Sequence, residues 1–456
     1  MGGTTLTRRR HAVVVGGSLA GLLSARVLLD HFEEVTLLER DGFPGEPVSR
    51  PGVPQGRHLH VLWEHGRGLL DGLIPGLESD LLAGGAPDLR LPADFLWLTS
   101  GGWRRRFDTT RMLTFSRGLL DHAVRGRLFG EPRLAVRTGI EVTGLTGDEA
   151  VTGVRYTERG DAARAEELMA ADLVVDATGR GSHAPAWLAE LGRPLPRETR
   201  IDPLLGYASR YYAIPPGHDP GWKALYLQAG PPEAKRTGGL FPQEGGRWIC
   251  SLSGAGGDYP PTDEEGYLEY ARGLRDPVLY EAIKDAEPLT PVVSFRRTAG
   301  HRRHYDRMRS WPAGFAAIGD SVCAFNPIYG QGITVAAASA LELDRMLRED
   351  RSTRWFQRRA KRAGAGAWLI STGEDRRYAE TQGPRVLPHT RLINAYVSLA
   401  VRAANTDPDS CADMLDVLGL AKPPTSLFRP AALARIMANR SRPPEAAPLL
   451  PEPAAR

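Results

Sequence analysis

Apolar and polar residues follow two different periods along this chain. Residues 11–15 (HAVVV) form an unbroken apolar run, residues 18–32 carry apolar side chains every three to four positions, and residues 34–40 form a second apolar run. The first and third patterns predict buried strands, and the second predicts a helix between them. The chain therefore opens with a strand, a tight turn, a helix and a second strand, which together form a βαβ unit.

A segment rich in Gly, Pro and His follows at 41–60. The glycines and prolines, which interrupt helices and strands, predict a long loop that can extend along a ligand. An amphipathic helix is expected from about 61 to 73. Short apolar runs between 133 and 176 are separated by Gly- and Asp-containing turns. These runs predict strands that return to the first sheet.

Alternating stretches between about 200 and 300 predict a second, antiparallel sheet with one covered face. Residues 316–318 form another buried run, and a long helix of small residues is expected after it. From about 350 onward the pattern is helical, and a Pro- and Ala-rich tail, expected to be disordered, ends the chain.

Composition narrows the functional classes. The 58 basic and 54 acidic residues leave a net charge of only +4, and the basic residues are spread along all 456 positions. Solvated surface charge explains this pattern better than a nucleic-acid interface. Cys250, Cys323 and Cys411 lie far apart with neither disulfide nor zinc spacing, so no metal site is expected.

The N-terminus resembles a secretory signal only superficially. Arg8, Arg9 and Arg10 precede an apolar stretch, but Arg26 and Asp30 interrupt it and no small-residue cleavage site follows. No window approaches the roughly 20 apolar residues that a membrane span needs. We expect a cytoplasmic protein without stable membrane insertion.

The first turn carries a dinucleotide-binding pattern. VVVGGSLAG places Gly16, Ser18 and Gly21 at the three fingerprint positions, and Glu39 ends the second strand. Gly16 permits the tight turn, Gly21 permits close packing of the helix, and the acidic side chain can accept hydrogen bonds from a ribose. Helix-start amides then face a pyrophosphate. The alternative is a plain Gly-rich turn. The residues expected to bind the cofactor here are Gly16, Gly17, Ser18, Ala20, Gly21, Glu39 and Arg40.

A second pattern follows the buried run at 316–318. Asp320 ends a strand and can accept hydrogen bonds from a ribityl chain, while Pro327, Gly330, Gln331 and Gly332 precede a helix whose N-terminus can stabilise negative charge on a flavin. GDSVCAFNPIYGQG resembles the motif GD followed by P-x-x-G-Q-G of FAD-dependent aromatic hydroxylases, the superfamily of p-hydroxybenzoate hydroxylase.

Other segments carry the same resemblance. Arg50 in RPGV and Arg117 in FSRGLL match arginines that reach the flavin nucleotide in that superfamily, with a surface charge as the alternative for each. DATGRGS, from Asp176, resembles an interior motif that usually contains Asp-Gly, and the departure puts direct NAD(P)H binding in doubt. Within the superfamily, GVPQGRHLHVLWEHGRGLLDGLIPGL and WLISTGEDRRYAETQG resemble bacterial polyether-type flavin epoxidases.

The resemblance implies an α/β fold. A Rossmann-like FAD-binding domain of the glutathione reductase type (1–65, 110–185 and 295–347) is interleaved with an antiparallel-sheet substrate domain (66–109 and 186–294). A C-terminal helical region (348–440) and the disordered tail (441–456) follow.

The resemblance also implies the reaction. Reduced FAD and O2 give a C4a-hydroperoxyflavin that inserts one oxygen atom into a large apolar natural-product intermediate, a polyketide, terpenoid or aromatic compound. NAD(P)H supplies the electrons, directly or through a separate flavin reductase. Alkene epoxidation is expected, with phenol-type hydroxylation and prenyl-chain reduction as alternatives. The flavin carries the chemistry, so no catalytic side chain is assigned; the residues expected to face substrate or flavin are Gln55, His58, His60, Trp63 and Tyr207.

Overall fold

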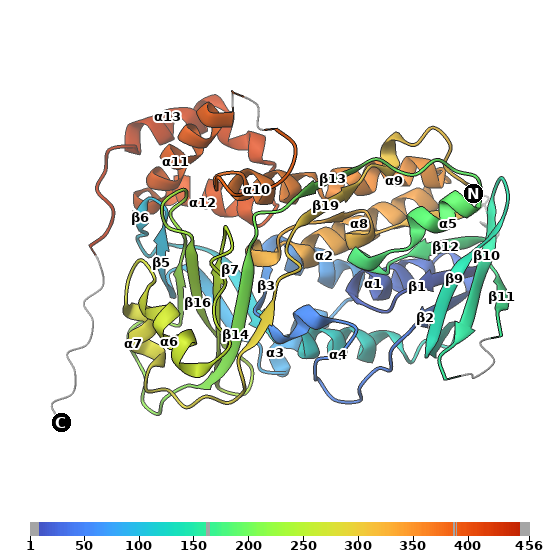
Figure 1. The fold of residues 1–456 in the computed structure, drawn as a ribbon, viewed down its shortest axis with the longest axis horizontal. Coiled ribbons are helices and arrows are strands. Elements are labelled where there is room, and N and C mark those ends of the chain that lie inside the picture. The colour runs from blue at the N-terminus through green and yellow to red at the C-terminus, as the bar shows by residue number, and fades with distance from the viewer. Residues whose placement is uncertain (1–8, 161–164, 386–387, 389, 447–456) are drawn as a thin grey trace, which may run out of the picture.

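The computed structural model describes residues 9–160, 165–385, 388 and 390–446. Five sheets and the helices around them make up this part of the chain (Figure 1). None of the helices in these ranges is both long and apolar enough to cross a membrane.

A five-stranded parallel sheet combines strands from the first 176 residues with β20, and the expected βαβ unit lies at its centre. The continuous apolar run of β1 pairs on both sides, with Val15 opposite both Leu38 and Asp176. The strands lie in the order β20 (Phe315–Ala317), β12 (Leu173–Asp176), β1 (Arg9–Val15), β2 (Phe32–Glu39) and β8 (Leu134–Thr138).

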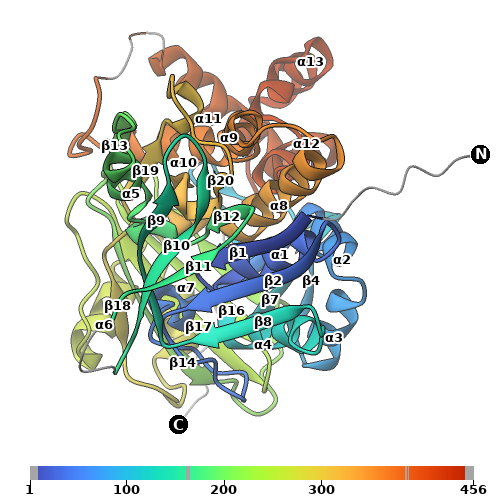
Figure 2. The same cartoon turned by 90° about the vertical axis from the view of Figure 1, so that its right-hand side faces the viewer.

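Both faces of this sheet are covered, as buried parallel strands require. Successive residues of β1 point to opposite faces, so Val14 packs with the helices on one side and Val13 and Val15 pack on the other side. The first face is covered by α1 (Leu19–Leu28), α4 (Arg117–Leu128) and α8 (Gly332–Arg348). The second face carries β9 (Ile140–Gly147), β10 (Val151–Glu158), β11 (Glu167–Ala170) and α5 (Ala184–Glu190) (Figure 2).

A seven-stranded sheet forms the second large layer. Its pairs are antiparallel except that β15 runs parallel to β5. The strands lie in the order β18 (Val293–Phe295), β14 (Gly206–Ala213), β17 (Arg247–Gly254), β16 (Arg236–Gln243), β15 (Ala224–Leu227), β5 (Phe95–Thr99) and β6 (Gly102–Trp103). One face packs on α6 (Glu264–Arg272) and α7 (Val278–Ile283). The other faces β3 (His60–Trp63), β7 (Asp108–Phe115) and α12 (Pro408–Leu418).

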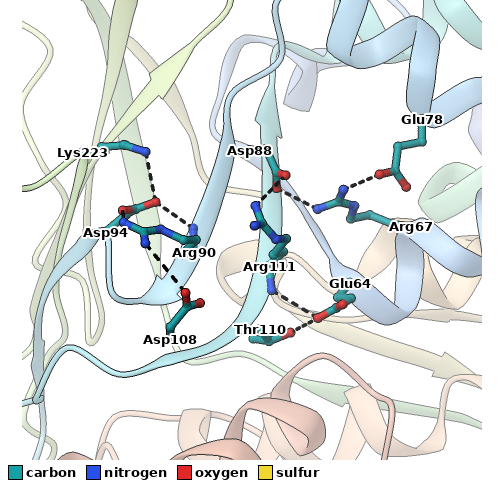
Figure 3. Close-up of polar contacts among 10 residues, drawn as sticks. All are labelled: Glu64, Arg67, Glu78, Asp88, Arg90, Asp94, Asp108, Thr110, Arg111 and Lys223. Carbon is teal, nitrogen blue, oxygen red and sulfur yellow. Dashed lines mark hydrogen bonds and ion pairs between the residues drawn. The ribbon is translucent and has the colours of Figure 1, made fainter.

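Two small sheets connect these layers. One has the order β3, β7 and β4 (Asp88–Pro92), and the other has the order β13 (Glu198–Ile201), β19 (Gly300–Arg303) and β21 (Cys323–Ala324). Ion pairs hold β4 and β7 against α2 (Glu64–Leu73) and α3 (Leu77–Ala83). Figure 3 shows the buried Arg67 guanidinium between Glu78 and Asp88, 2.8 Å from the latter, while Arg111 lies 3.0 Å from the other oxygen of Asp88.

The C-terminal region is helical, as its pattern predicts. It consists of α9 (Thr353–Ala363), α10 (Ala365–Asp375), α11 (Thr390–Thr406), α12 and α13 (Pro430–Asn439), and α11 to α13 lie beside β5 and β6 (Figure 1). Within the expected tail, Glu445 pairs with Trp103 through a hydrogen bond of 3.3 Å. Residues 447–456 of that tail lie outside the described ranges.

One element begins later than the sequence predicts. The helix expected from about residue 61 begins at Glu64, because His60–Trp63 form β3 instead. This strand pairs with β7, with Leu62 opposite Leu113, and buries its apolar side chains. Tertiary pairing therefore overrides the helical spacing at this point.

Candidate functional site: a cofactor cradle and an aromatic wall

Three strand ends converge at one edge of the parallel sheet. β1, β12 and β20 are neighbours with the same direction, so Gly16, Thr178 and Gly319 follow them side by side. Gly16 has φ +99°, and a Cβ there would lie 2.8 Å from the carbonyl oxygen of Ala177. Gly319 has φ +62°, and its Cβ would lie 2.9 Å from the Ala20 side chain. The two predicted cofactor motifs are thus in direct contact.

The first motif forms the start of α1. The Gly17 amide donates a 2.6 Å hydrogen bond to Oε2 of Glu39, and the Asp41 amide donates a 3.0 Å hydrogen bond to Oε1. Glu39 is buried, and its carboxylate fixes the turn through these two hydrogen bonds even without a ligand. An ionised carboxylate accepts about four hydrogen bonds, so acceptor capacity remains for a hydroxyl group.

Buried arginines surround this turn. Arg50 lies 3.2 Å from Oε2 of Glu39, and Arg117 donates a 2.9 Å hydrogen bond to the Ser18 hydroxyl. Arg125, which the sequence analysis missed, lies on the same side of α4 as Arg117 and packs over Phe43 together with Arg50. Burial lowers the pKa of the Arg125 guanidinium. Buried guanidinium groups next to a helix N-terminus suit a pyrophosphate.

The second motif presents an acidic side chain without a donor. Asp320 lies in the short 3-10 helix η4 (Gly319–Ser321), and among the described residues its carboxylate receives no hydrogen bond. The nearest cationic group is Nε of Arg180 at 3.7 Å, itself a buried donor without an acceptor. Although 41% of the Asp320 side chain remains accessible, the surrounding protein raises its pKa.

The loop before α8 folds against β3. Pro327 opens the 3-10 helix η5 (Pro327–Tyr329), and Gly330 follows with φ +64°. A Cβ at Gly330 would lie 2.3 Å from Val61, so only glycine fits there. Gln331 donates a 2.8 Å hydrogen bond to the carbonyl of Leu418, while a Cβ at Gly332 would meet no atom within 4 Å.

The DATG segment uses its acid internally. Asp176 is fully buried, and its carboxylate accepts hydrogen bonds from the amide and hydroxyl of Thr178 and from the Ser182 hydroxyl. Three donors saturate much of the carboxylate. Asp176 therefore closes the turn between β12 and α5, and it offers little to a nicotinamide cofactor.

These residues fit FAD. The donor-free Asp320 carboxylate can accept hydrogen bonds from hydroxyl groups, and the unpaired Nε of Arg180 can donate to a carbonyl or anionic oxygen. Nη1 of Arg50 is ion-paired with Glu39 without a hydrogen bond, so it too can donate to an anionic oxygen. Helix-start amides and buried arginines lie at the neighbouring strand ends of the same edge, as a molecule with separate hydroxyl and phosphate groups requires.

A second cluster lies where the 41–60 loop meets the seven-stranded sheet. His58 is 4% exposed, its Nδ1 lies 2.9 Å from the Ser209 hydroxyl, and its ring packs edge-on against Tyr207 at 4.5 Å. Burial lowers the pKa of His58 to about 3 and that of His60 to about 4. Burial also raises the pKa of the Tyr207 phenol. At neutral pH these three side chains are uncharged.

The remaining predicted residues are dispersed. Trp63 lies against the loop before α8, where its Nε1 donates a 3.2 Å hydrogen bond to the carbonyl of Tyr329. The Gln55 side chain is half-buried in the 3-10 helix η1 (Pro54–Arg57). Arg40 is 65% exposed and lies beside Asp41, so the structure does not bring its guanidinium to the cradle.

Arg125 and Arg180 could have been found in the sequence. Arg125 lies eight residues after Arg117, two helical turns along the same face of α4. Arg180 follows the strand-end segment DATG and lies opposite Asp320. The remaining predicted residues stay predictions for cofactor and substrate contacts.

Known flavin enzymes resemble this chain in structure and in sequence. The structure is similar to that of the flavin-dependent brominase Bmp2, with a TM-score of 0.67 and 15% sequence identity over 94% of this chain and 98% of the brominase. The sequence is 28% identical over 367 residues to kynurenine 3-monooxygenase from Salinispora arenicola, covering 75% of this chain and 73% of that enzyme. The fold and the site define an FAD-dependent monooxygenase.

The family follows from a nearer relative. The chain is 34% identical over 348 residues to Protein Rv3254 from Mycobacterium tuberculosis, covering 74% of this chain and 73% of that protein. It belongs to the family of Protein Rv3254. No protein-family model matches the chain. The monooxygenase relatives confirm the prediction of FAD as cofactor and O2 as co-substrate, with NAD(P)H as the typical reductant. The finer resemblance to polyether-type epoxidases stays a prediction.

Proposed function

We propose that this enzyme inserts one oxygen atom into an alkene of a large, apolar natural-product intermediate. When bound, FAD supplies the chemistry that activates O2. The residues that would hold it are Asp320 and Arg180 on one side and Gly17, Arg50 and Arg117 on the other. The protein contributes orientation and exclusion of water.

The observation that carries this proposal is the neutral wall formed by His58, His60 and Tyr207. Hydroxylation of a phenol benefits from a base that takes the phenolic proton, whereas an alkene has no such proton. His58, with a pKa of about 3, and His60, with a pKa of about 4, are poor bases at neutral pH. The wall can donate a hydrogen bond or orient a substrate without exchanging protons.

The seven-stranded sheet carries a group of aromatic rings near its contact with β3. Trp97 lies 5.7 Å from Tyr226 and 6.2 Å from Phe95, and Phe241 contacts both Phe95 and Tyr226. These rings share the sheet face that is turned toward β3, β7 and α12, where Phe95, Trp97 and Phe241 are buried as core residues. Tyr226 is the one of the four that is partly accessible, so it is the ring that can contact a hydrocarbon chain or a polycyclic system.

Aromatic hydroxylation is the second candidate, because kynurenine 3-monooxygenases are among the relatives. The test reconstitutes the protein with FAD and follows NADPH oxidation under isotopically labelled O2, with and without an added flavin reductase. A polyene and a phenol serve as matched substrates. A labelled epoxide from the polyene supports the proposal, a labelled catechol supports the second candidate, and a saturated, unlabelled product would identify a prenyl-type reductase.

A further inference from the structure

A buried carboxyl group lies beside the cofactor loop and has no part in the site described above. Asp375 ends α10 and is 2% exposed. Its Oδ1 accepts a 3.0 Å hydrogen bond from Nδ2 of Asn326, which is also buried. Its Oδ2 is buried without a hydrogen-bond partner. A buried carboxyl group with a hydrogen bond to only one of its two oxygens lowers the stability of the fold, so a stabilising role does not explain the presence of Asp375.

Asn326 is the residue through which Asp375 reaches the loop. It immediately precedes Pro327, and its Oδ1 accepts a 3.3 Å hydrogen bond from the Ile328 amide. The backbone amide of Asn326 in turn donates a 3.2 Å hydrogen bond to the hydroxyl of Ser371, which lies one helical turn before Asp375. Helix α10 therefore holds the first residue of the loop at two points, and one of them can gain or lose a proton.

The groups that face Asp375 come from several elements. Glu374 precedes it on α10, Asp202 lies in the turn after β13, and the phenols of Tyr329 and Tyr378 lie within electrostatic range. Burial, with smaller contributions from Glu374 and Asp202, raises the pKa of Asp375 to about 7, against the opposing hydrogen bond from Asn326. The carboxyl group thus changes charge within the neutral range.

We propose that Asp375 is a positioning residue that sets the cofactor loop, residues 326–332, through its hydrogen bond with Asn326. The ionised carboxylate accepts the Asn326 hydrogen bond more strongly than the neutral acid does, because charge-assisted hydrogen bonds are stronger. The loop is held most firmly when Asp375 is ionised, and FAD binding is then tightest. This inference rests on the proposed FAD-dependent function and adds pH control of the same site.

The experiment measures the FAD dissociation constant of the apoprotein by quenching of flavin fluorescence, from about pH 6 to about pH 8.5. Wild type is expected to bind FAD about threefold to tenfold more tightly at the upper end, with a midpoint near pH 7. Asp375→Asn keeps the shape and the acceptor oxygen but cannot ionise, so its affinity should not change with pH. Glu374→Gln removes a neighbouring negative charge and should lower the midpoint while keeping the amplitude.

A matched control removes a carboxylate elsewhere in the helical region. Asp413 on α12 pairs with Lys422 and Arg435, so Asp413→Asn should leave the pH dependence of FAD affinity as in wild type. Unchanged pH dependence in Asp375→Asn overturns the inference. If that variant does not fold, an unchanged midpoint in Glu374→Gln overturns it instead. Binding that ignores pH in wild type removes this inference alone, whereas no FAD binding at any pH removes the proposed function as well.

Discussion

The carboxylate of Asp320 lies 3.7 Å from Nε of Arg180, too far for a hydrogen bond, and neither group has another partner at those atoms among the described residues. Asp320 lies in η4 just after β20, and Arg180 follows β12, so the adjacent strands bring the two groups together. A buried donor and a partly accessible acceptor that are too far apart to bond each other leave room for a polar ligand that bonds both.

Asp320→Ala is expected to weaken FAD binding by about 1 to 3 kcal/mol, because it removes a charged acceptor from a polar ligand. Asp320→Asn keeps one acceptor oxygen and should lose less. Isothermal titration of the apoprotein with FAD measures both changes. FAD affinity equal to that of wild type in Asp320→Ala would rule out this role.

Gly332→Ala separates cofactor contact from folding. A Cβ at Gly332 meets no protein atom within 4 Å, and the residue lies in the first turn of α8. The apoprotein should therefore keep its stability or gain up to about 1 kcal/mol, while FAD binding weakens because the methyl group occupies the approach to the loop.

Gly21→Ala is the contrasting variant. Its Cβ would lie 1.8 Å from the carbonyl oxygen of Gly16, so the apoprotein itself should be destabilised. Urea unfolding and FAD titration of the two variants give the comparison. Unaltered FAD affinity in Gly332→Ala would remove Gly332 from the cofactor site.

The buried histidine predicts acid sensitivity. His58 has a pKa of about 3 in the folded protein against 6.5 as its ordinary value, so the unfolded chain takes up a proton between these pH values that the folded chain does not. The free energy of unfolding should fall as the pH drops below about 6.5, by about 2 kcal/mol from this residue at pH 5.

His58→Asn should flatten that decline, and urea unfolding at neutral pH and at about pH 5 measures it. The exposed His122 provides the control, since His122→Asn should leave the decline as it is. If His58→Asn loses stability in acid as steeply as wild type, His58 is not buried in its neutral form.

The ion pairs of Figure 3 predict that replacing Arg67 and replacing Arg111 will lower the stability of the fold by unequal amounts. Arg67 is buried between Glu78 and Asp88, so Arg67→Ala leaves Glu78 without a cationic partner and leaves Asp88 with Arg111 alone, and it should cost about 3 kcal/mol. The Arg111 side chain is half exposed, and Arg111→Ala should cost no more than about 1 kcal/mol. Thermal unfolding in low and high salt measures both, and equal losses would contradict the difference in burial.

The parallel sheet and both cofactor motifs could be predicted from the sequence because their signals are local. Apolar runs mark β1, β12 and β20, and the glycines at 16, 21 and 330 are required by contacts that leave no space for a side chain. The strands of the seven-stranded sheet were harder to predict from the sequence. Strand β16 contains Gly238, Gly239 and Pro242, which argue against a strand, yet β15 and β17 hold it on both sides.

The candidate site was predicted only in part, for similar reasons. β5 joins the sheet by pairing with β15, well over a hundred residues later, and no local pattern announces such a partner. The contact of His58 with Tyr207 and Ser209 likewise joins segments that only the fold brings together. Arg40 was expected from its place after Glu39, but sequence adjacency did not reveal that its side chain points outward.

The order of the parallel sheet also bears on how the protein is made. β20 is its edge strand and, among the strands that the structure describes, pairs only with β12, although some 140 residues separate them along the chain. During synthesis, the open edge of β12 has no native partner on the ribosome until β20 emerges, and unpaired edges invite association with other chains. Because Asp320 arrives with β20, the growing chain completes its cofactor cradle and closes this edge at the same moment.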